Sequence, residues 1–300
     1  MDSFDLSPEV RKQISNYHAA AVVIGVVGVI AGIACFVWSM HLADDGNEGF
    51  ILPLILGFGI AVGAVALGVY LWQKGTVLFK DHAIRGVIEE QFPGCTYLPK
   101  GHINEAAVAR TGMFPRWTTI KGSDLTRGEY NGWKFAFSNL KLTYQVGSGK
   151  SRRTVTEFEG IWIAYQMDRT IDGSVAVIEK MGSRSRHRKN RVETDNAAFN
   201  AKFHVISQTP KTVFYVLTPQ FMEDINRLDY YARAHTNLFF GGNAVHLALN
   251  IDRQKFTSTT SRSEVLQQIA YIKKMLNLIV ADAYMFGWEE PASADPFTTA

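Results

Sequence analysis

Three carboxylates are the first candidates for acid–base chemistry in this sequence. Glu157 and Glu159 lie two residues apart in the segment TEFEGIWIAYQM, so on a strand they would share one face. Two carboxylates on one face can act as general acid and general base, and Asp124 is a third acid for a site assembled from distant residues. No nucleophile or metal-binding residue is visibly paired with them. An exposed or edge-strand face is therefore the favoured interpretation, and a hydrolase-like enzyme is the alternative.

Cofactor and metal motifs are incomplete. The segment GSGKS, residues 147–151, resembles a phosphate-binding loop, but that loop needs a glycine where Tyr144 stands and a helix after it. A strand is expected to follow here, so we interpret the segment as a polar hairpin loop. The eight histidines are scattered without an HExxH pattern, and Cys35 and Cys95 are far apart. We predict no catalytic residues, no cofactor and no metal site.

One basic stretch, GSRSRHRKNR at residues 182–191, accounts for the net positive charge of the chain. Nucleic-acid binding would require interleaved aromatic residues or a recognition helix, and the stretch has neither, so we predict no nucleic-acid partner. Docking on anionic lipid and a solvated loop are the two interpretations left open. The residues predicted to bind lipid are Lys150, Arg152, Arg153, Arg184, Arg186, Arg188, Lys189 and Arg191.

Two long apolar segments precede the rest of the chain. Residues 19–40 and 50–72 carry no charged side chain. As helices they would each reach about 33 Å, enough for the hydrocarbon core of a bilayer. The first is too long for the apolar part of a signal peptide and lacks a clear cleavage motif. We therefore predict two transmembrane helices. Intramembrane charge usually marks a translocation path, and its absence here argues against a transporter.

The flanking charges predict the orientation of these helices. Residues 41–49 between them carry three acids and no Lys or Arg, whereas basic residues lie before the first segment and after the second. By the positive-inside rule, both termini would be cytoplasmic, in a plasma (inner) membrane. Ser7 and Pro8 predict the start of a helix ahead of the first span.

Small residues recur at helical spacing in both spans, a pattern that lets helix backbones approach closely. Packing of the two spans on each other as a hairpin is the favoured interpretation, and packing between copies in a homo-oligomer is the alternative. The predicted helix-packing residues are Gly25, Gly28, Gly32, Gly59 and Gly63.

The remainder predicts a mixed α+β domain with antiparallel sheets. Gly241-Gly242-Asn243 predicts a hairpin turn. The apolar stripe of the last helix indicates a helix covering the sheet, with a coiled-coil seam as the alternative. The expected helices are 74–92, 103–114, one opening at Thr218-Pro219, and 261–286; the expected strands are 132–146, 156–167, 174–181, 202–208 and 212–218.

Two segments also carry a family resemblance. GMFPRWTTIKGSDLTRGEYNGWKFAFSNLKL with FEGIWIAYQMDR, and DNAAFNAKFHVISQTPKTVFYVLTPQFMEDINRL, resemble the two blocks of a bacterial family known only as a domain of unknown function. Phe199, Phe203, Leu217, Thr218 and Pro219 occupy the family's positions in the second block. The resemblance covers roughly residues 75 to 285. It implies an inner-membrane protein with a cytoplasmic α+β domain, sometimes associated with LemA-type proteins, and supplies no catalytic residues.

These observations lead to a membrane-anchored adaptor or scaffold as the first functional hypothesis. It would bind protein partners and the anionic lipid surface, with an enzyme acting on a membrane substrate as the alternative. The expected organisation is a cytoplasmic amphipathic helix at 1–18, spans at 19–40 and 50–72, an extracytoplasmic loop at 41–49, a cytoplasmic domain at 73–290 and a disordered tail at 291–300.

Overall fold

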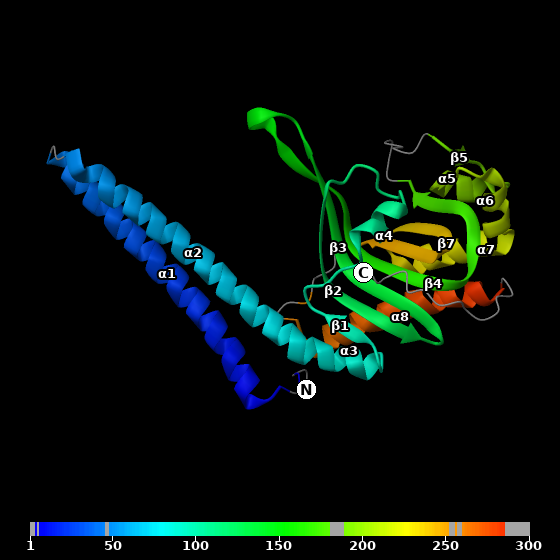
Figure 1. Cartoon of the computed structure of the whole chain (residues 1–300), viewed down its shortest axis with the longest axis horizontal. Coiled ribbons are helices and arrows are strands. Elements are labelled where there is room, and N and C mark those ends of the chain that lie inside the picture. The colour runs from blue at the N-terminus through cyan, green and yellow to red at the C-terminus, as the bar shows by residue number, and fades with distance from the viewer. Residues whose placement is uncertain are drawn as a thin grey trace. The chain divides into compact units, whose positions relative to one another are not determined.

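The computed structural model describes residues 4, 6–45, 48–180, 189–251, 256 and 260–285 of the 300-residue chain (Figure 1). The chain divides into two compact units. The hairpin unit comprises Met1–Gly86 with Phe256–Arg262, and the α+β unit comprises Val87–Lys255 with Ser263–Ala300. Each unit is described by itself.

The hairpin unit is built on two long helices that lie side by side (Figure 1). Its first helix, α1 (Pro8–Asp44), begins where the sequence predicts, because the Ser7 hydroxyl accepts a hydrogen bond from the Val10 N–H at 3.3 Å and Pro8 occupies the first turn. No break separates the segment before residue 19 from the apolar run. A 3-10 turn, η1 (Glu48–Phe50), precedes α2 (Ile51–Phe79), which continues through a π-helical turn, η2 (Lys80–Ile84), into α3 (Arg85–Gln91).

The α+β unit is organised around one antiparallel sheet. Among the described residues, seven strands join in the order β1-β2-β3-β4-β6-β5, and β7 pairs with β4. Every pairing is antiparallel, so the predicted α+β class with an antiparallel sheet is confirmed. The strands are β1 (Thr96–Leu98), β2 (Thr119–Tyr130), β3 (Trp133–Val146), β4 (Arg153–Glu179), β5 (Arg191–Val192), β6 (Phe203–Ile206) and β7 (His235–Asn250).

The described helices of this unit are α3 from Val87 onward, α4 (Glu105–Arg110), α5 (Ala197–Lys202), α6 (Pro210–Val216), α7 (Pro219–Ala232) and α8 (Arg262–Met285). Trp162 and Phe158 in β4 lie in a buried cluster with Val108 of α4. In α8, the stripe Val265, Ile269, Ile272 and Leu276 is buried, as expected for a helix packed against the unit rather than an exposed coiled-coil seam. The Tyr271 hydroxyl also donates to the Ala232 carbonyl at 2.9 Å, which ties α8 to the end of α7.

Two local predictions were wrong. Residues 212–218, expected as a strand, belong mainly to α6, because Pro210 fits the first turn of a helix, and Val213 and Val216 are buried while Phe214 and Tyr215 are exposed. Gly241-Gly242-Asn243 forms no hairpin turn. These residues lie inside β7, which pairs with β4 from Ile161 to Ile178 and shifts register there, with Gly242 at a φ of 58°. β4 likewise includes the two strands predicted at 156–167 and from Ser174.

Candidate functional site

The contact between α1 and α2 is made by small residues. A Cβ built on Gly28 would lie 2.0 Å from the Cβ of Ala64, and one on Gly32 would lie 3.0 Å from the Gly57 carbonyl oxygen. A Cβ on Gly68 would lie 2.9 Å from the Ala21 carbonyl oxygen. Real Cβ atoms do not tolerate such distances, so the two backbones approach as closely as they do only because these positions lack a side chain.

The other predicted packing glycines lie elsewhere on the helices. Among the described residues, none comes within 4 Å of a Cβ built on Gly25, Gly59 or Gly63. The contact between the helices therefore uses Gly28 and Gly32, and leaves these three glycines at open positions.

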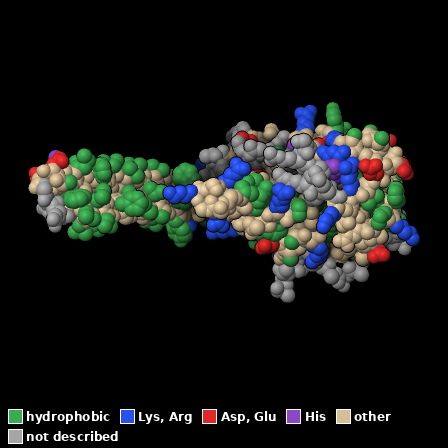
Figure 2. All heavy atoms as spheres, turned by 90° about the horizontal axis from the view of Figure 1, so that it is seen from above, with side chains coloured by type: hydrophobic (Ala, Val, Ile, Leu, Met, Phe, Trp, Pro, Cys, Tyr) green, Lys and Arg blue, Asp and Glu red, His purple; other side chains and the backbone are tan. Residues whose placement is uncertain are grey.

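Large apolar side chains cover the outside of the hairpin unit. Phe58 is 74% exposed and Leu52 is 65% exposed, and Figure 2 shows hydrophobic side chains over the face of the hairpin in view, with charged ones only near its ends. The Ser39 hydroxyl donates to the Phe50 carbonyl at 2.7 Å near the connector. Both helices are long and apolar enough to cross a membrane, by length and composition.

A basic two-stranded arm projects from the sheet of the α+β unit, and we call residues 143–156 the β3–β4 arm (Figure 1). The pairing of β2 with β3 ends at Thr119 and Thr143, and beyond that point β3 pairs with β4 as far as Val146 and Arg153. A 3-10 turn, η3 (Gly149–Ser151), forms the tip. The predicted lipid-binding residues Lys150, Arg152 and Arg153 are all exposed there, and residues 143–156 include no acid.

The longer basic stretch lies elsewhere on the same unit. Arg184, Arg186 and Arg188 fall outside the described residues. Lys189 is exposed in a turn, and Arg191 begins β5, with its guanidinium 3.3 Å from the Glu193 carboxylate. Figure 1 shows β5 and the tip of the β3–β4 arm well apart on the α+β unit, so the described basic residues do not gather into one surface.

The three candidate acids occupy separate environments. Asp124 is 1% exposed and has a φ of 64° at a register shift between β2 and β3. Its carboxylate accepts hydrogen bonds from the Tyr97 hydroxyl at 2.7 Å, the Ser123 hydroxyl at 2.6 Å and the Asn139 amide at 3.2 Å. This residue links β1, β2 and β3, which is a structural use of a buried carboxylate.

The pair on β4 is also divided. Glu157 stands at a register shift and is buried, and its carboxylate accepts from the backbone N–H of Arg116 at 3.0 Å. Glu159 is half-buried and forms a 2.6 Å ion pair with Lys141 on β3. Each carboxylate therefore has its own partner, and none of the contacts described here joins them to each other or to Asp124.

Sequence reasoning singled out neither of two sets of buried or partly buried ionisable groups. His246 accepts a hydrogen bond from the Trp162 indole at 3.1 Å, and burial, with a smaller contribution from Arg110, lowers its pKa to about 4. Burial also raises the pKa of Glu179, and nearby Asp229 adds to the shift, although the Thr236 N–H donates to the Glu179 carboxylate. These residues come from separate strands and helices, so no local spacing reveals them. Within the described residues, no group of three potential ligands could hold a metal ion.

Comparison with known proteins found a family model and a solved structure that are similar to parts of this chain. Residues 156–281 match the model of a family described as "Protein of unknown function (DUF3137)". This range includes the second block of the predicted resemblance and the segment FEGIWIAYQMDR of the first, while the part of the first block at residues 112–142 lies outside it. Curated proteins gave no match. Among solved structures, the chain is similar to the mycobacterial trehalose monomycolate transport factor A, with 12% identity and a TM-score of 0.35, over 63% of this chain and 92% of that one.

Proposed function

We propose that this protein is a membrane-anchored adaptor. The hairpin unit spans the bilayer, and the α+β unit lies on the cytoplasmic side, where it binds protein partners and touches anionic lipid through the β3–β4 arm. The observation that carries the proposal is the packing of the hairpin unit, which has glycine and alanine inside and large apolar side chains outside. Water would penalise that surface at about 25 cal/mol per Å², whereas lipid chains would not.

The β3–β4 arm supports the lipid contact. Its three cations extend beyond the sheet without a neighbouring acid in the arm. A basic residue near an anionic leaflet contributes about 1 kcal/mol, so three contribute about 3 kcal/mol, or about 100-fold in the docking equilibrium at low salt. The segment 182–191 is a separate candidate for the same chemistry.

The test uses the full-length chain in nanodiscs, with an environment-sensitive dye on Ser148→Cys in a Cys35→Ala, Cys95→Ala background. We expect the dye emission to shift in discs that contain an anionic lipid but not in zwitterionic discs, and salt should reverse the shift. Lys150→Ser, Arg152→Ser and Arg153→Ser together should abolish it. A control with the same change in charge, Lys100→Ser, Lys134→Ser and Lys211→Ser at exposed positions, should retain it.

Different outcomes would reject different parts of the proposal. Release of the full-length chain from membranes by alkaline carbonate would reject the anchor. An equal shift in both kinds of disc, or the same loss in both triple variants, would reject the lipid contact of the arm and leave the anchor in place. The adaptor role is tested separately by crosslinking in membranes, where repeated recovery of the chain alone as a monomer would contradict it.

The remaining functional hypotheses stay predictions. Cytoplasmic termini follow from the flanking charges and from the family resemblance, and association with LemA-type proteins follows from the resemblance alone. For the enzymatic alternative, Asp124, Glu157 and Glu159 offer no common site, because each is engaged in a different contact.

A further inference from the structure

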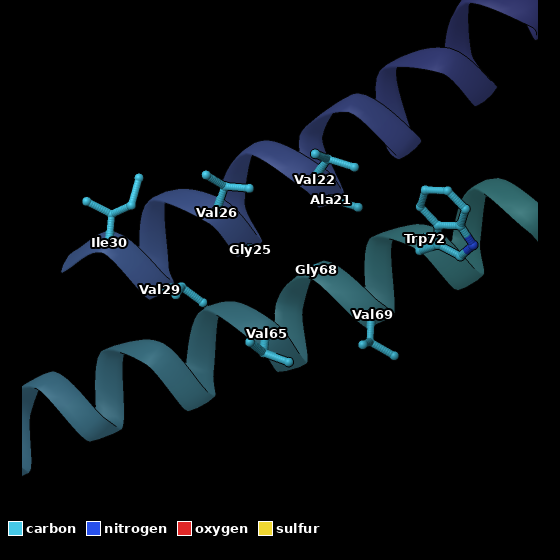
Figure 3. A pocket seen from close by; sticks show the side chains of 10 residues that line it. All are labelled: Ala21, Val22, Gly25, Val26, Val29, Ile30, Val65, Gly68, Val69 and Trp72. Carbon is cyan, nitrogen blue, oxygen red and sulfur yellow. The ribbon is translucent and has the colours of Figure 1, made fainter. Parts of the chain in front are cut away.

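An apolar groove runs along the hairpin unit between α1 and α2. Its volume is about 490 Å³, within the range of small-molecule sites. Ala21, Gly25 and Val29 line it from α1, and Val65, Gly68 and Trp72 line it from α2. Figure 3 shows Gly25 and Gly68 on the facing sides of the two helices, with Trp72 toward one end of the groove.

The groove exists because its floor lacks side chains. Gly68 lies against the backbone of Ala21, whereas a Cβ on Gly25 would meet no described atom within 4 Å. Bulky side chains form the sides, and Val22 and Val69 remain 55% and 52% exposed. Gly25 is thus an open position that the helix contact does not require, and it keeps the groove hollow.

The residues that line the groove favour a thin apolar chain over a helix. A packed helix is about 10 Å across, and close helix contacts use small residues on both partners. Here small residues form only the floor, and valine, isoleucine and tryptophan stand beside it. A chain of methylene groups can lie along such a slot, while a helix would rest on its edges.

Charge at one end of the groove favours a lipid with an anionic headgroup. Arg11, His18, Val22, Gly25 and Val29 follow at spacings of seven, four, three and four, so they share one side of α1. The His18 ring stacks on Trp72 with centroids 4.3 Å apart, at the end of the groove that leads toward Arg11. Lys12 adds positive charge next to Arg11, Glu9 subtracts one, and Lys74 lies near the level of His18, because Gly75 lies against the His18 ring. Further along, Asp81 and Arg85 pair with each other and add no net charge.

We propose that this groove holds one acyl chain of an anionic membrane phospholipid, whose headgroup lies at the level of Arg11. The site rests on the proposed membrane anchor, because the acyl chain reaches the groove only from within a bilayer. It is distinct from the β3–β4 arm, which would contact headgroups and no acyl chain. The bound lipid fills space that the hairpin unit leaves open on one side.

The test measures lipid retained by the full-length chain after reconstitution with equal amounts of phosphatidylglycerol and phosphatidylcholine and transfer to mild detergent. Native mass spectrometry should show one retained phospholipid per chain, mainly phosphatidylglycerol. Gly25→Leu should lower the retained fraction about tenfold, because its side chain occupies the space of the acyl chain. Gly63→Leu makes the same change at an open position outside the groove and should retain the lipid. Arg11→Ser should remove the preference for phosphatidylglycerol.

Equal retention in Gly25→Leu and the unaltered chain would overturn the proposal, as would an equal loss in both leucine variants. Conversion of a dimer to a monomer by Gly25→Leu would also overturn it, since the groove would then be a contact between copies.

Trp72 gives a second measurement that leaves the groove intact. In a Trp38→Phe chain, phosphatidylglycerol with brominated chains should quench more emission than brominated phosphatidylcholine, and equal quenching would contradict the site. If the chain stays in membranes after carbonate extraction, these outcomes concern the groove and not a failure of the membrane anchor.

Discussion

Phe58 and Phe158 are residues of the same type, but one is exposed and the other is buried. Phe58 in α2 is 74% exposed, whereas Phe158 in β4 is fully buried against Phe114 and Trp162. In the hairpin unit it is the glycines that are buried, since Gly28, Gly57 and Gly68 are among its buried residues. In water, burying large apolar side chains drives folding. In a lipid environment the hydrophobic gain from burial disappears, and close contact between helix backbones stabilises the packing instead.

The largest effect that tests this comparison comes from truncating both phenylalanines. Phe158→Ala should lower the free energy of unfolding of the α+β unit by about 3–5 kcal/mol, because it leaves a cavity between two aromatic rings. Phe58→Ala should change the free energy of unfolding of the hairpin unit by less than about 0.5 kcal/mol. Chemical denaturation of the full-length chain in mild detergent, followed by tryptophan emission, would measure both. Similar losses from the two variants would show that the units do not differ in this way.

A second expected effect is a loss of stability of the α+β unit at low pH. Burial favours neutral His246, with a pKa of about 4 in the folded chain against 6.5 for the ordinary group. The unfolded chain therefore binds the proton more readily between these values, and stability should fall as the pH drops from about 6.5 to 4, by about 3 kcal/mol in all. The contribution of neutral His246 to stability is fully present above pH 6.5.

Denaturation of the full-length chain at several pH values would measure this loss. His246→Gln keeps an acceptor for the Trp162 indole and should flatten the profile over the same range. A variant that retains the full slope would assign the titration to another group.

The sequence predicted the architecture where one physical signal was strong. Uninterrupted apolar runs marked α1 and α2, and alternation marked β3. It failed where several signals overlapped. Residues 212–216 are all β-branched or aromatic and so favour a strand, whereas the burial of Val213 and Val216 on one side of a helix is set by tertiary packing. Gly241-Gly242 has the composition of a turn, yet it serves a register shift opposite Ile171 and Ser174 of β4.

The candidate sites depended more strongly on tertiary structure. Glycine spacing identified Gly25, Gly28 and Gly32 together, but only the relative rotation of the helices separates the two that pack from the one that opens a groove. Similarly, Glu157 and Glu159 would share a face on a regular strand, and a register shift beside Glu157 gives them different partners. Such shifts have no local sequence signature.

The smallest effect tests the glycine half of the comparison. Gly28→Leu introduces a side chain where even a Cβ would overlap Ala64, so we expect the hairpin unit to lose about 1–3 kcal/mol, whereas Gly63→Leu, at an open position, should lose almost nothing. Energy transfer between dyes on Gln13→Cys and Gln73→Cys, in a chain without native cysteines, would report opening of the hairpin as SDS is added. Gly28→Leu should open it at a lower fraction of SDS. If Gly63→Leu were the more damaging change, the helices would pack through the opposite side of α2, and both the groove and the separation of packing from open glycines would be refuted.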